Sequence, residues 1–251
     1  MTTAYDTPSG APAPASSKTP SQASLNCGVV GNCAFSALID QAGQVVWSCL
    51  PRFDGDPVFN TLLDDTENGS VWGIDIENYA RTEQFYEPNT AVLRTRLYDT
   101  DGRGVEITDF APRFLSRDRM FRPLMLIRRV RPLDRAVRIR VRLRPRFDWG
   151  KLAPQITQGS HHIRYVGPEQ TLRLNTDVSL NYVLSESYFV LDKTANFLQD
   201  NSKTVPEFGQ AAFMVLMMKG FGKQEADGSM TWNVKLDQAG KVMINGREMP
   251  H

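Results

Sequence analysis

The chain has 251 residues, of which 41% are hydrophobic, and this is enough apolar material for one or two domains with a sizeable core. The formal net charge of +1 gives no bulk attraction to nucleic acid or to a membrane, and we expect neither as a partner. Three cysteines in a chain of this size argue against a disulfide framework, and their spacing supplies too few ligands for zinc, so no metal is expected.

The chain begins with residues 1–24, which are rich in Ala, Pro, Ser and Thr. This composition predicts a disordered leader. The first 17 residues contain no Lys or Arg, and no apolar stretch of the signal-peptide type follows them. The longest apolar run near the other end, 211–218, is far shorter than the ~20 residues that a membrane span needs. We therefore expect a soluble cytoplasmic protein.

A β-hairpin is predicted next. Residues 34–39 form a short apolar run, and residues 40–43 form a turn whose last residue is a glycine, the residue that most readily takes a positive φ. Residues 44–50 are rich in β-branched and aromatic side chains and predict the returning strand. Pro51 ends that strand because proline cannot donate to the ladder of hydrogen bonds. Cys33 and Cys49 then fall on neighbouring strands, where we interpret them as small hydrophobic residues in packing.

The middle of the chain predicts one short strand after another, without a long window of helical spacing. Many short strands separated by turns favour a sandwich or a barrel over alternating strands and helices. One short helix is expected over residues 58–63, after Pro57. The candidate strands are 70–76, 91–98, 104–110, 124–130, 136–143, 162–166, 171–175, 181–185 and 188–191.

An arginine-rich stretch lies between Arg113 and Arg146, with thirteen arginines and no lysine. Within residues 137–144 aliphatic residues and arginines alternate strictly, which places all the arginines on one face of a strand. The favoured interpretation is a solvent-facing or domain-facing strand whose arginines pair with carboxylates. Contact with a sugar or a partner is a second interpretation. A nucleic-acid-binding sheet is the third, although this face carries no interleaved aromatic residues.

The sequence contains few patterns typical of catalysis. It has no Gly-x-Ser-x-Gly elbow, no Walker-type loop and no dinucleotide-binding glycine loop, so we expect no cofactor. Asp109 and Asp148 are interpreted as turn-forming side chains. For Trp149 a place in the core or in an interface is favoured over stacking on a sugar.

The hairpin and the loop after it resemble the opening motif of the bacterial glycoside hydrolase family 15 proteins, the glucoamylase and trehalase-like group. The matching positions are Gly31, Asn32, Cys33, Ser36, Ala37, Leu38, Ile39, Asp40, Gly43, Trp47, Cys49, Leu50, Pro51, Arg52, Phe53, Asp54 and Gly55. Further matches follow in the same order at 86–93, 107–113, 122–123, 128–130 and 189–192. The resemblance covers residues 25–206, and it is the combination of these pieces that makes it specific.

The resemblance implies that residues 25–206 form an antiparallel β-sandwich, an all-β fold. In the family a larger (α/α)6 helical barrel follows and carries the two carboxylates for inverting hydrolysis of a glucosidic bond. About 45 residues remain after residue 206, too few for a dozen helices of about 11 residues each. Residues 207–251 do not resemble the family's linker helix, and their turns and short apolar runs predict a C-terminal β-hairpin. We therefore expect no catalytic residue here and no activity of this chain alone.

The resemblance also places the loop of Arg52, Phe53 and Asp54 on the side of the sandwich that faces the barrel. These residues are the candidate substrate-binding site, with Phe53 as an apolar platform for a glucosidic saccharide. The alternative is that Arg52 and Asp54 are an ion pair that closes a loop. The expected partner is the helical barrel, on the same chain or on another one.

Three functions remain open at this point. The first is the supporting, non-catalytic domain of an α-glucoside hydrolase. The second is a stand-alone sugar-binding or protein-interaction module. The third is a degenerate product without activity, because a frameshift, rearrangement or fusion would each explain residues 207–251. The barrel loops that choose among starch-type glucans, trehalose and isomalto-type sugars are not part of this sequence.

Overall fold

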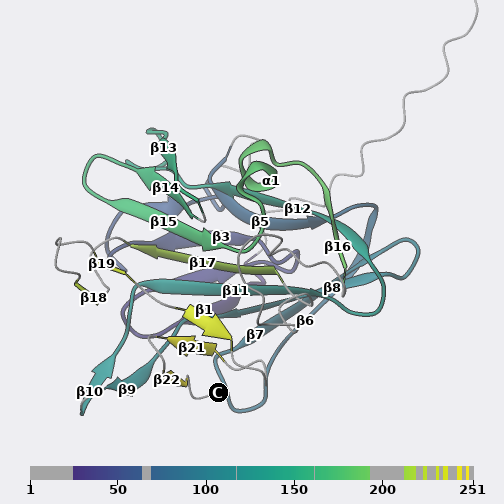
Figure 1. Ribbon diagram of the computed structural model, residues 1–251, viewed down its shortest axis with the longest axis horizontal. Helices are drawn as coiled ribbons and strands as arrows, with labels where there is room; N and C mark the ends of the chain where they lie inside the picture. The colour runs from purple at the N-terminus through teal and green to yellow at the C-terminus, as the bar shows by residue number, and fades with distance from the viewer. Residues whose placement is uncertain are drawn as a thin grey trace, which may run out of the picture.

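The computed structural model describes residues 25–63, 69–116, 118–160 and 162–192, together with the backbone of six short strands beyond residue 211 (Figure 1). The expected leader, residues 1–24, and much of the segment 207–251 lie outside the described residues. In the described part of the chain, every element is a strand apart from one six-residue helix.

The first sheet has seven strands, in the order β1-β2-β3-β5-β12-β16, with β4 beside β3. All its pairs are antiparallel. Its strands are β1 (Gly28–Gly31), β2 (Ser36–Ile39), β3 (Val45–Cys49), β4 (Pro57–Phe59), β5 (Val71–Ile76), β12 (Val137–Arg144) and β16 (Phe189–Leu191).

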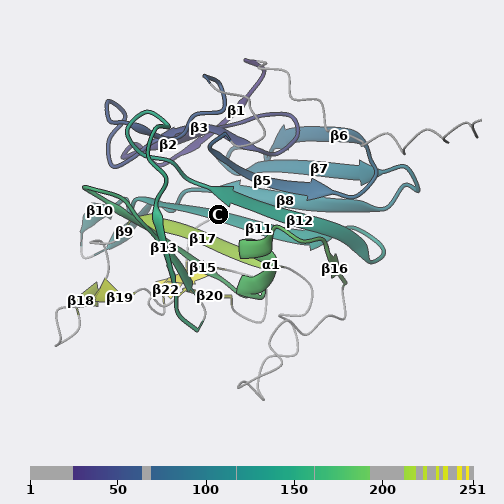
Figure 2. The ribbon, with the colours of Figure 1, turned by 90° about the horizontal axis from the view of Figure 1, so that it is seen from above.

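The second sheet has eight antiparallel strands, in the order β13-β14-β15-β17-β11-β8-β7-β6. Its strands are β6 (Tyr79–Tyr86), β7 (Leu93–Asp99), β8 (Gly104–Phe110), β11 (Met125–Pro132), β13 (Gln155–Gln158), β14 (His162–Val166), β15 (Thr171–Thr176) and β17 (Ala212–Met218). A short ribbon of β9 (Phe114–Ser116) and β10 (Arg119–Phe121) stands apart from both sheets. Figure 2 shows β2 and β3 on one side of the molecule and β15 and β17 on the other.

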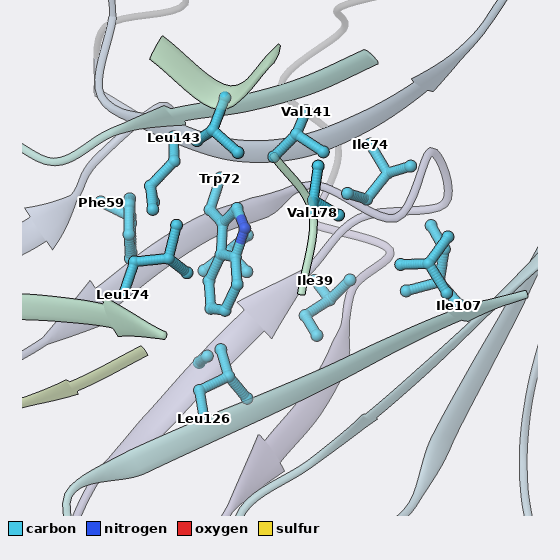
Figure 3. Packing of buried hydrophobic residues seen from close by; sticks show 14 of the residues in the cluster. Ile39, Phe59, Trp72, Ile74, Ile107, Leu126, Val141, Leu143, Leu174 and Val178 are labelled. Atoms are coloured by element: carbon cyan, nitrogen blue, oxygen red, sulfur yellow. The ribbon is translucent and has the colours of Figure 1, made fainter. Parts of the chain in front are cut away.

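One hydrophobic core joins the two sheets, and this confirms the expected all-β antiparallel sandwich. The strict alternation of β7 and β12 puts one residue in two into this core, which is what a strand buried on one face requires. Figure 3 shows Leu174 of β15 beside the ring of Trp72 of β5, with Ile107 of β8 further along the same core.

The predicted hairpin is present as β2 and β3. The Asp40 carboxylate accepts a hydrogen bond from the backbone N–H of Gln44 at 2.8 Å, and Gly43 has a φ of 73°. The backbone N–H of Gly43 also donates to the Asp40 carbonyl oxygen at 3.0 Å. The side chain of Asp40 therefore does part of the work of closing the turn.

Two predicted elements are wrong in type. The helix expected over 58–63 is instead β4, because Val58 and Phe59 are buried and the segment pairs with the end of β3. The strand expected over 181–185 is instead the helix α1 (Leu180–Ser185), which ends at Glu186 in the left-handed region. A helix of six residues is too short for its 3.6-residue period to show in the sequence.

Asp109 is the third correction. It was expected to form a turn, but it lies inside β8, fully buried, and pairs with Arg128 of β11, which is also fully buried. Arg128 further donates to the carbonyl oxygens of Trp72 and Gly43, at 2.9 and 2.8 Å, in the opposite sheet. A buried charge is tolerated when its hydrogen bonds are made, and this one connects the two layers of the sandwich.

The arginines of β12 pair with carboxylates, as the favoured interpretation holds. Arg140 and Arg142 both bond to Asp75 of the neighbouring strand, with contacts of 2.7–3.0 Å. Arg138 pairs with Glu77, and Arg144 pairs with Glu186. This face of the first sheet is therefore largely neutralised by its own residues.

The C-terminal segment is described only through its strands. The backbone of β17 pairs with β15 on one side and with β11 on the other, so this strand lies inside the second sheet. Beyond it, β18 (Lys223–Gln224) pairs with β19 (Met230–Thr231), and β20 (Val234–Leu236), β21 (Val242–Ile244) and β22 (Arg247–Glu248) form a small sheet. In the described part of the chain, no helix is long and apolar enough to cross a membrane.

Candidate functional site

Two turns with the same sequence leave the first sheet at the same end. Strands β3 and β12 lie on either side of β5 and are both antiparallel to it, so they run in the same direction. Each is followed by Pro-Arg-Phe-Asp, at residues 51–54 and 145–148. The two segments are offset by four residues along the strands, because Val45, six residues before Pro51, and Leu143, two residues before Pro145, both lie opposite Trp72.

The first of these turns contains the predicted site residues. Arg52 Nε donates to Asp54 Oδ1 at 2.8 Å, and the terminal guanidinium nitrogen donates to Oδ2 at 3.0 Å, so the pair is bidentate. The hydrogen bond from Arg52 holds the pKa of Asp54 below its ordinary value and raises the pKa of Arg52. Phe53 stands between them with 57% of its surface exposed. The ion pair that was the alternative interpretation is thus present, and the ring of Phe53 is exposed to solvent.

The second turn presents a tryptophan. Phe147 is buried and exchanges backbone hydrogen bonds with Leu152, which fixes the base of the turn. Asp148, Trp149 and Gly150 follow with φ values of 47°, 55° and 91°. Two consecutive non-glycine residues in this region cost about 1 kcal/mol or more each, and such strain is often held where a side chain has a task. Trp149 is 53% exposed, so a place for it in the core is wrong.

Strand β4 and the residues after it join the two turns. The backbone N–H of Arg146 donates to the Val58 carbonyl oxygen at 3.1 Å. A Cβ at Gly150 would lie 2.6 Å from Nδ2 of the buried Asn60, so only glycine fits there. We call the exposed residues of this end the turn surface. Its members are Arg52, Phe53, Asp54, Leu63, Trp149 and Leu152.

The carboxylates of the two turns each have a cation nearby. Asp54 is already engaged by Arg52, and Asp148 has Lys151 Nζ at 3.7 Å from its Oδ2. Exposed aromatic rings can instead stack on a sugar or fill a pocket of another domain. Within the described ranges, no group of three His, Cys, Asp or Glu side chains is placed to hold a metal ion.

The cysteines are free thiols in three different environments. Cys49 is buried, as the packing interpretation requires, and Cys27 is partly buried. Cys33 is exposed, with a φ of 68°, and its Sγ lies 3.4 Å from a guanidinium nitrogen of Arg113. The packing interpretation is therefore wrong for Cys33, because it precedes β2 instead of lying in it.

Sequence reasoning found the first turn and missed the second as a site. The repeated Pro-Arg-Phe-Asp was the available signal, since equal sequences after two parallel-running strands end at the same edge of a sheet. Together the fold and the turns define an antiparallel β-sandwich domain with exposed side chains at one end of its seven-stranded sheet. The chain belongs to the trehalase-like N-terminal domain family, whose model matches residues 24–197.

Curated relatives agree with this family. Trehalase 1 of Sulfolobus acidocaldarius is 32% identical over 155 residues, which are 60% of this chain and 25% of that protein. The trehalase of Thermoplasma volcanium is 24% identical over 155 residues, 61% of this chain and 24% of that protein. Trehalase 2 of Sulfolobus acidocaldarius is 25% identical over 164 residues, 65% of this chain and 26% of that protein. This chain thus spans about a quarter of the length of these relatives. No solved structure matches it.

Proposed function

We propose that this chain is the supporting N-terminal domain of a glycoside hydrolase of family 15, of the bacterial trehalase-like type, and that its turn surface meets the catalytic domain. The observation that carries the proposal is the pair of Pro-Arg-Phe-Asp turns, which expose Phe53 and Trp149 at one end of the sheet. The named trehalases support it, because this chain matches only about a quarter of their length. The partner is a helical barrel, and the substrate class is a glucosidic saccharide.

In this proposal Arg52, Phe53 and Asp54 line the edge of the sugar site. The bidentate ion pair fixes the turn, and Phe53 offers its ring to the saccharide or to the barrel. The chemistry belongs to the partner domain. An inverting glycosidase needs a general acid and a general base on opposite sides of the scissile bond, roughly 6.5–9.5 Å apart. The carboxylates of the two turns are instead exposed and engaged by Arg52 and Lys151.

The test measures glucose release from trehalose, maltose and isomaltose by the purified chain, first alone and then with a partner. The partner is Trehalase 1 of Sulfolobus acidocaldarius from which the quarter that matches this chain has been removed. We expect no glucose release by the chain alone. With the shortened trehalase we expect the chain to bind and to raise glucose release. Release by the chain alone, or a mixture no more active than the shortened trehalase, contradicts the proposal.

Single substitutions sharpen the test. Phe53→Ala and Trp149→Ala are each expected to weaken binding to the shortened trehalase by about thirtyfold, the usual cost of removing an aromatic anchor from an interface. Ile156→Ala is the matched control, because Ile156 is 52% exposed but lies on β13 of the other sheet. Equal losses in all three variants would assign the effect to general stability.

A stand-alone sugar-binding module is the second candidate, and the two exposed aromatic rings favour it. This function predicts that the chain binds trehalose or maltose directly, without a partner. Binding would shift the NMR signal of the Trp149 indole, and Trp149→Ala would abolish it. The cytoplasmic location is a further proposal, supported by three free cysteines, since disulfides are rare in that compartment.

A further inference from the structure

The outer face of the eight-stranded sheet, opposite the core, carries a row of polar residues across three strands. Arg129 of β11 lies opposite Thr108 of β8, and Thr108 lies opposite Arg94 of β7. Residues that oppose each other in antiparallel strands share a face and lie side by side. In the next row Arg131 lies opposite Glu106, which lies opposite Arg96. This face belongs to the eight-stranded sheet, whereas the turn surface belongs to the seven-stranded sheet.

Positive charge exceeds negative charge on this face. Glu106 is buried and is shared by three arginines, Arg94, Arg96 and Arg131, at 2.7–3.1 Å. Arg94 also pairs with Glu87. Arg129, at the β11 end of its row, takes part in none of these ion pairs. With Arg81 and Glu83 of β6, which pair with each other beside Arg96, five guanidinium groups face three carboxylates.

Arg129 is the unusual member. It is half-buried, its Nε is fully buried without a hydrogen bond, and it makes no ion pair with any residue that the structure describes. Burial, followed by the charge of Arg131, lowers the pKa of Arg129; the charge of Glu106 partly offsets this, and the charge of Arg94 adds to it. A desolvated charge without a partner is costly, so a fold keeps one when another group compensates it. The neighbouring hydroxyl of Thr108 adds a hydrogen-bond donor at the same place.

We propose that Arg129 and Thr108, with Arg131 beside them, form a binding site for an oxyanion, the phosphate or carboxylate group of a small ligand. The planar guanidinium binds two oxygens of such a group at once, and bonds of this kind are about twice as strong as neutral ones. Bound to the exposed part of the Arg129 guanidinium, the anion neutralises the excess charge. The site lies on the other sheet from Arg52 and Trp149. A negative result here therefore leaves the proposed contact with the catalytic domain untouched, and the reverse also holds.

The first experiment compares the thermal stability of the full chain with that of Arg129→Met in a chloride buffer without other anions. Methionine keeps much of the side-chain volume and removes the charge. Because the half-buried charge makes no ion pair with a described residue, we expect Arg129→Met to raise the Tm by a few degrees. A lower Tm in this variant would show that Arg129 holds the sheet together as a structural residue, and would overturn the proposal.

The second experiment titrates the chain with inorganic phosphate and, separately, with acetate, against sodium chloride of equal ionic strength. We expect a saturable rise in Tm with phosphate or acetate, absent with chloride and absent in Arg129→Met. The stronger of the two anions identifies the ligand as a phosphate or a carboxylate. We expect Thr108→Val, which keeps the shape and removes the hydroxyl, to weaken the apparent affinity about tenfold.

The matched control is Arg138→Met, since Arg138 is an exposed arginine of the first sheet paired with Glu77. This variant is expected to keep the full anion response. A response that is equal in Arg129→Met and in Arg138→Met, or no saturable response in the unaltered chain, contradicts the site. Thr108→Val removes no charge, so a Thr108→Val chain that keeps the full affinity for the anion also contradicts the site.

Discussion

At the scale of single residues, the most consequential contact is the buried pair of Arg128 and Asp109. Both side chains are 0% exposed, and the guanidinium binds the carboxylate with two contacts of 2.8 and 3.0 Å. Arg128 also stacks on Trp72, with its charged carbon 5.1 Å from the ring centre. One arginine of β11 therefore satisfies a carboxylate in its own sheet and two backbone carbonyls in the opposite sheet.

Removing one partner of this pair is expected to be severe. Arg128→Met leaves a buried carboxylate and two buried carbonyl oxygens without donors, and we expect the free energy of unfolding to fall by about 3–5 kcal/mol. Urea denaturation measures the change. The double variant Arg128→Met/Asp109→Leu is the control, because it removes both charges. If it is less stable than Arg128→Met, the buried carboxylate is not what makes the single change costly.

At the scale of the elements, Glu106 links three strands of the second sheet. Burial on its own raises the pKa of Glu106, but the hydrogen bond from Arg96, together with Arg131 and Arg94, holds that pKa below its ordinary value. The three arginines are 26–41% exposed, so their pairing with Glu106 is worth less than that of a fully buried pair. For Glu106→Gln we expect a loss of about 2 kcal/mol in unfolding free energy at neutral pH.

The same contact predicts a pH dependence. A carboxyl with a lowered pKa in the folded chain stabilises it fully above the unfolded pKa of about 4.3, and this contribution disappears as the pH falls through the folded pKa. We therefore expect stability to fall on acidification below about pH 5 more steeply in the unaltered chain than in Glu106→Gln. Glu77→Gln, which breaks the exposed pair with Arg138, serves as the control. Parallel pH profiles for the chain and Glu106→Gln would refute this role.

The burial pattern of a strand decides whether its sequence reveals it. Strands β8 and β14 have the bounds that the sequence predicted, because turns flank them and their apolar residues are regularly spaced. Strand β6 was missed because most of its residues are exposed on both faces, so no period of two marks it. Strand β4 was taken for a helix because three residues are too few to carry a period, and its partner, the end of β3, is visible only in three dimensions.

In the candidate site, too, some features can be predicted from the sequence and others depend on the fold. The pairing of Arg52 with Asp54 follows from local spacing, and the sequence alone foresaw it. The role of Trp149 depends on the order β3-β5-β12, which brings residues about a hundred positions apart in the chain to one sheet edge. Arg129 illustrates the limit most clearly. In the sequence it is one of thirteen arginines, and only the three-dimensional contacts show that it makes no ion pair with a described residue.

At the scale of the whole molecule, the sandwich depends on a strand from outside the matched family region. The family model ends at residue 197, yet β17 (Ala212–Met218) pairs along its length with both β11 and β15. We propose that the folding unit extends to residue 218. Without β17, two inner strands would present unpaired N–H and C=O groups in the middle of the sheet, which is the usual template for aggregation.

The prediction compares two shortened chains, one ending at residue 192 and one ending at residue 218. We expect the longer one to keep the Tm and the monomer or oligomer size of the full chain. The shorter one is expected to lose several kcal/mol of unfolding free energy and to aggregate, because a central strand contributes both its ladder of hydrogen bonds and its share of buried area. Circular dichroism melts and size-exclusion chromatography measure both effects. A chain ending at residue 192 that melts like the full chain would show that β11 and β15 need no strand between them, and would place the end of the domain where the family model ends.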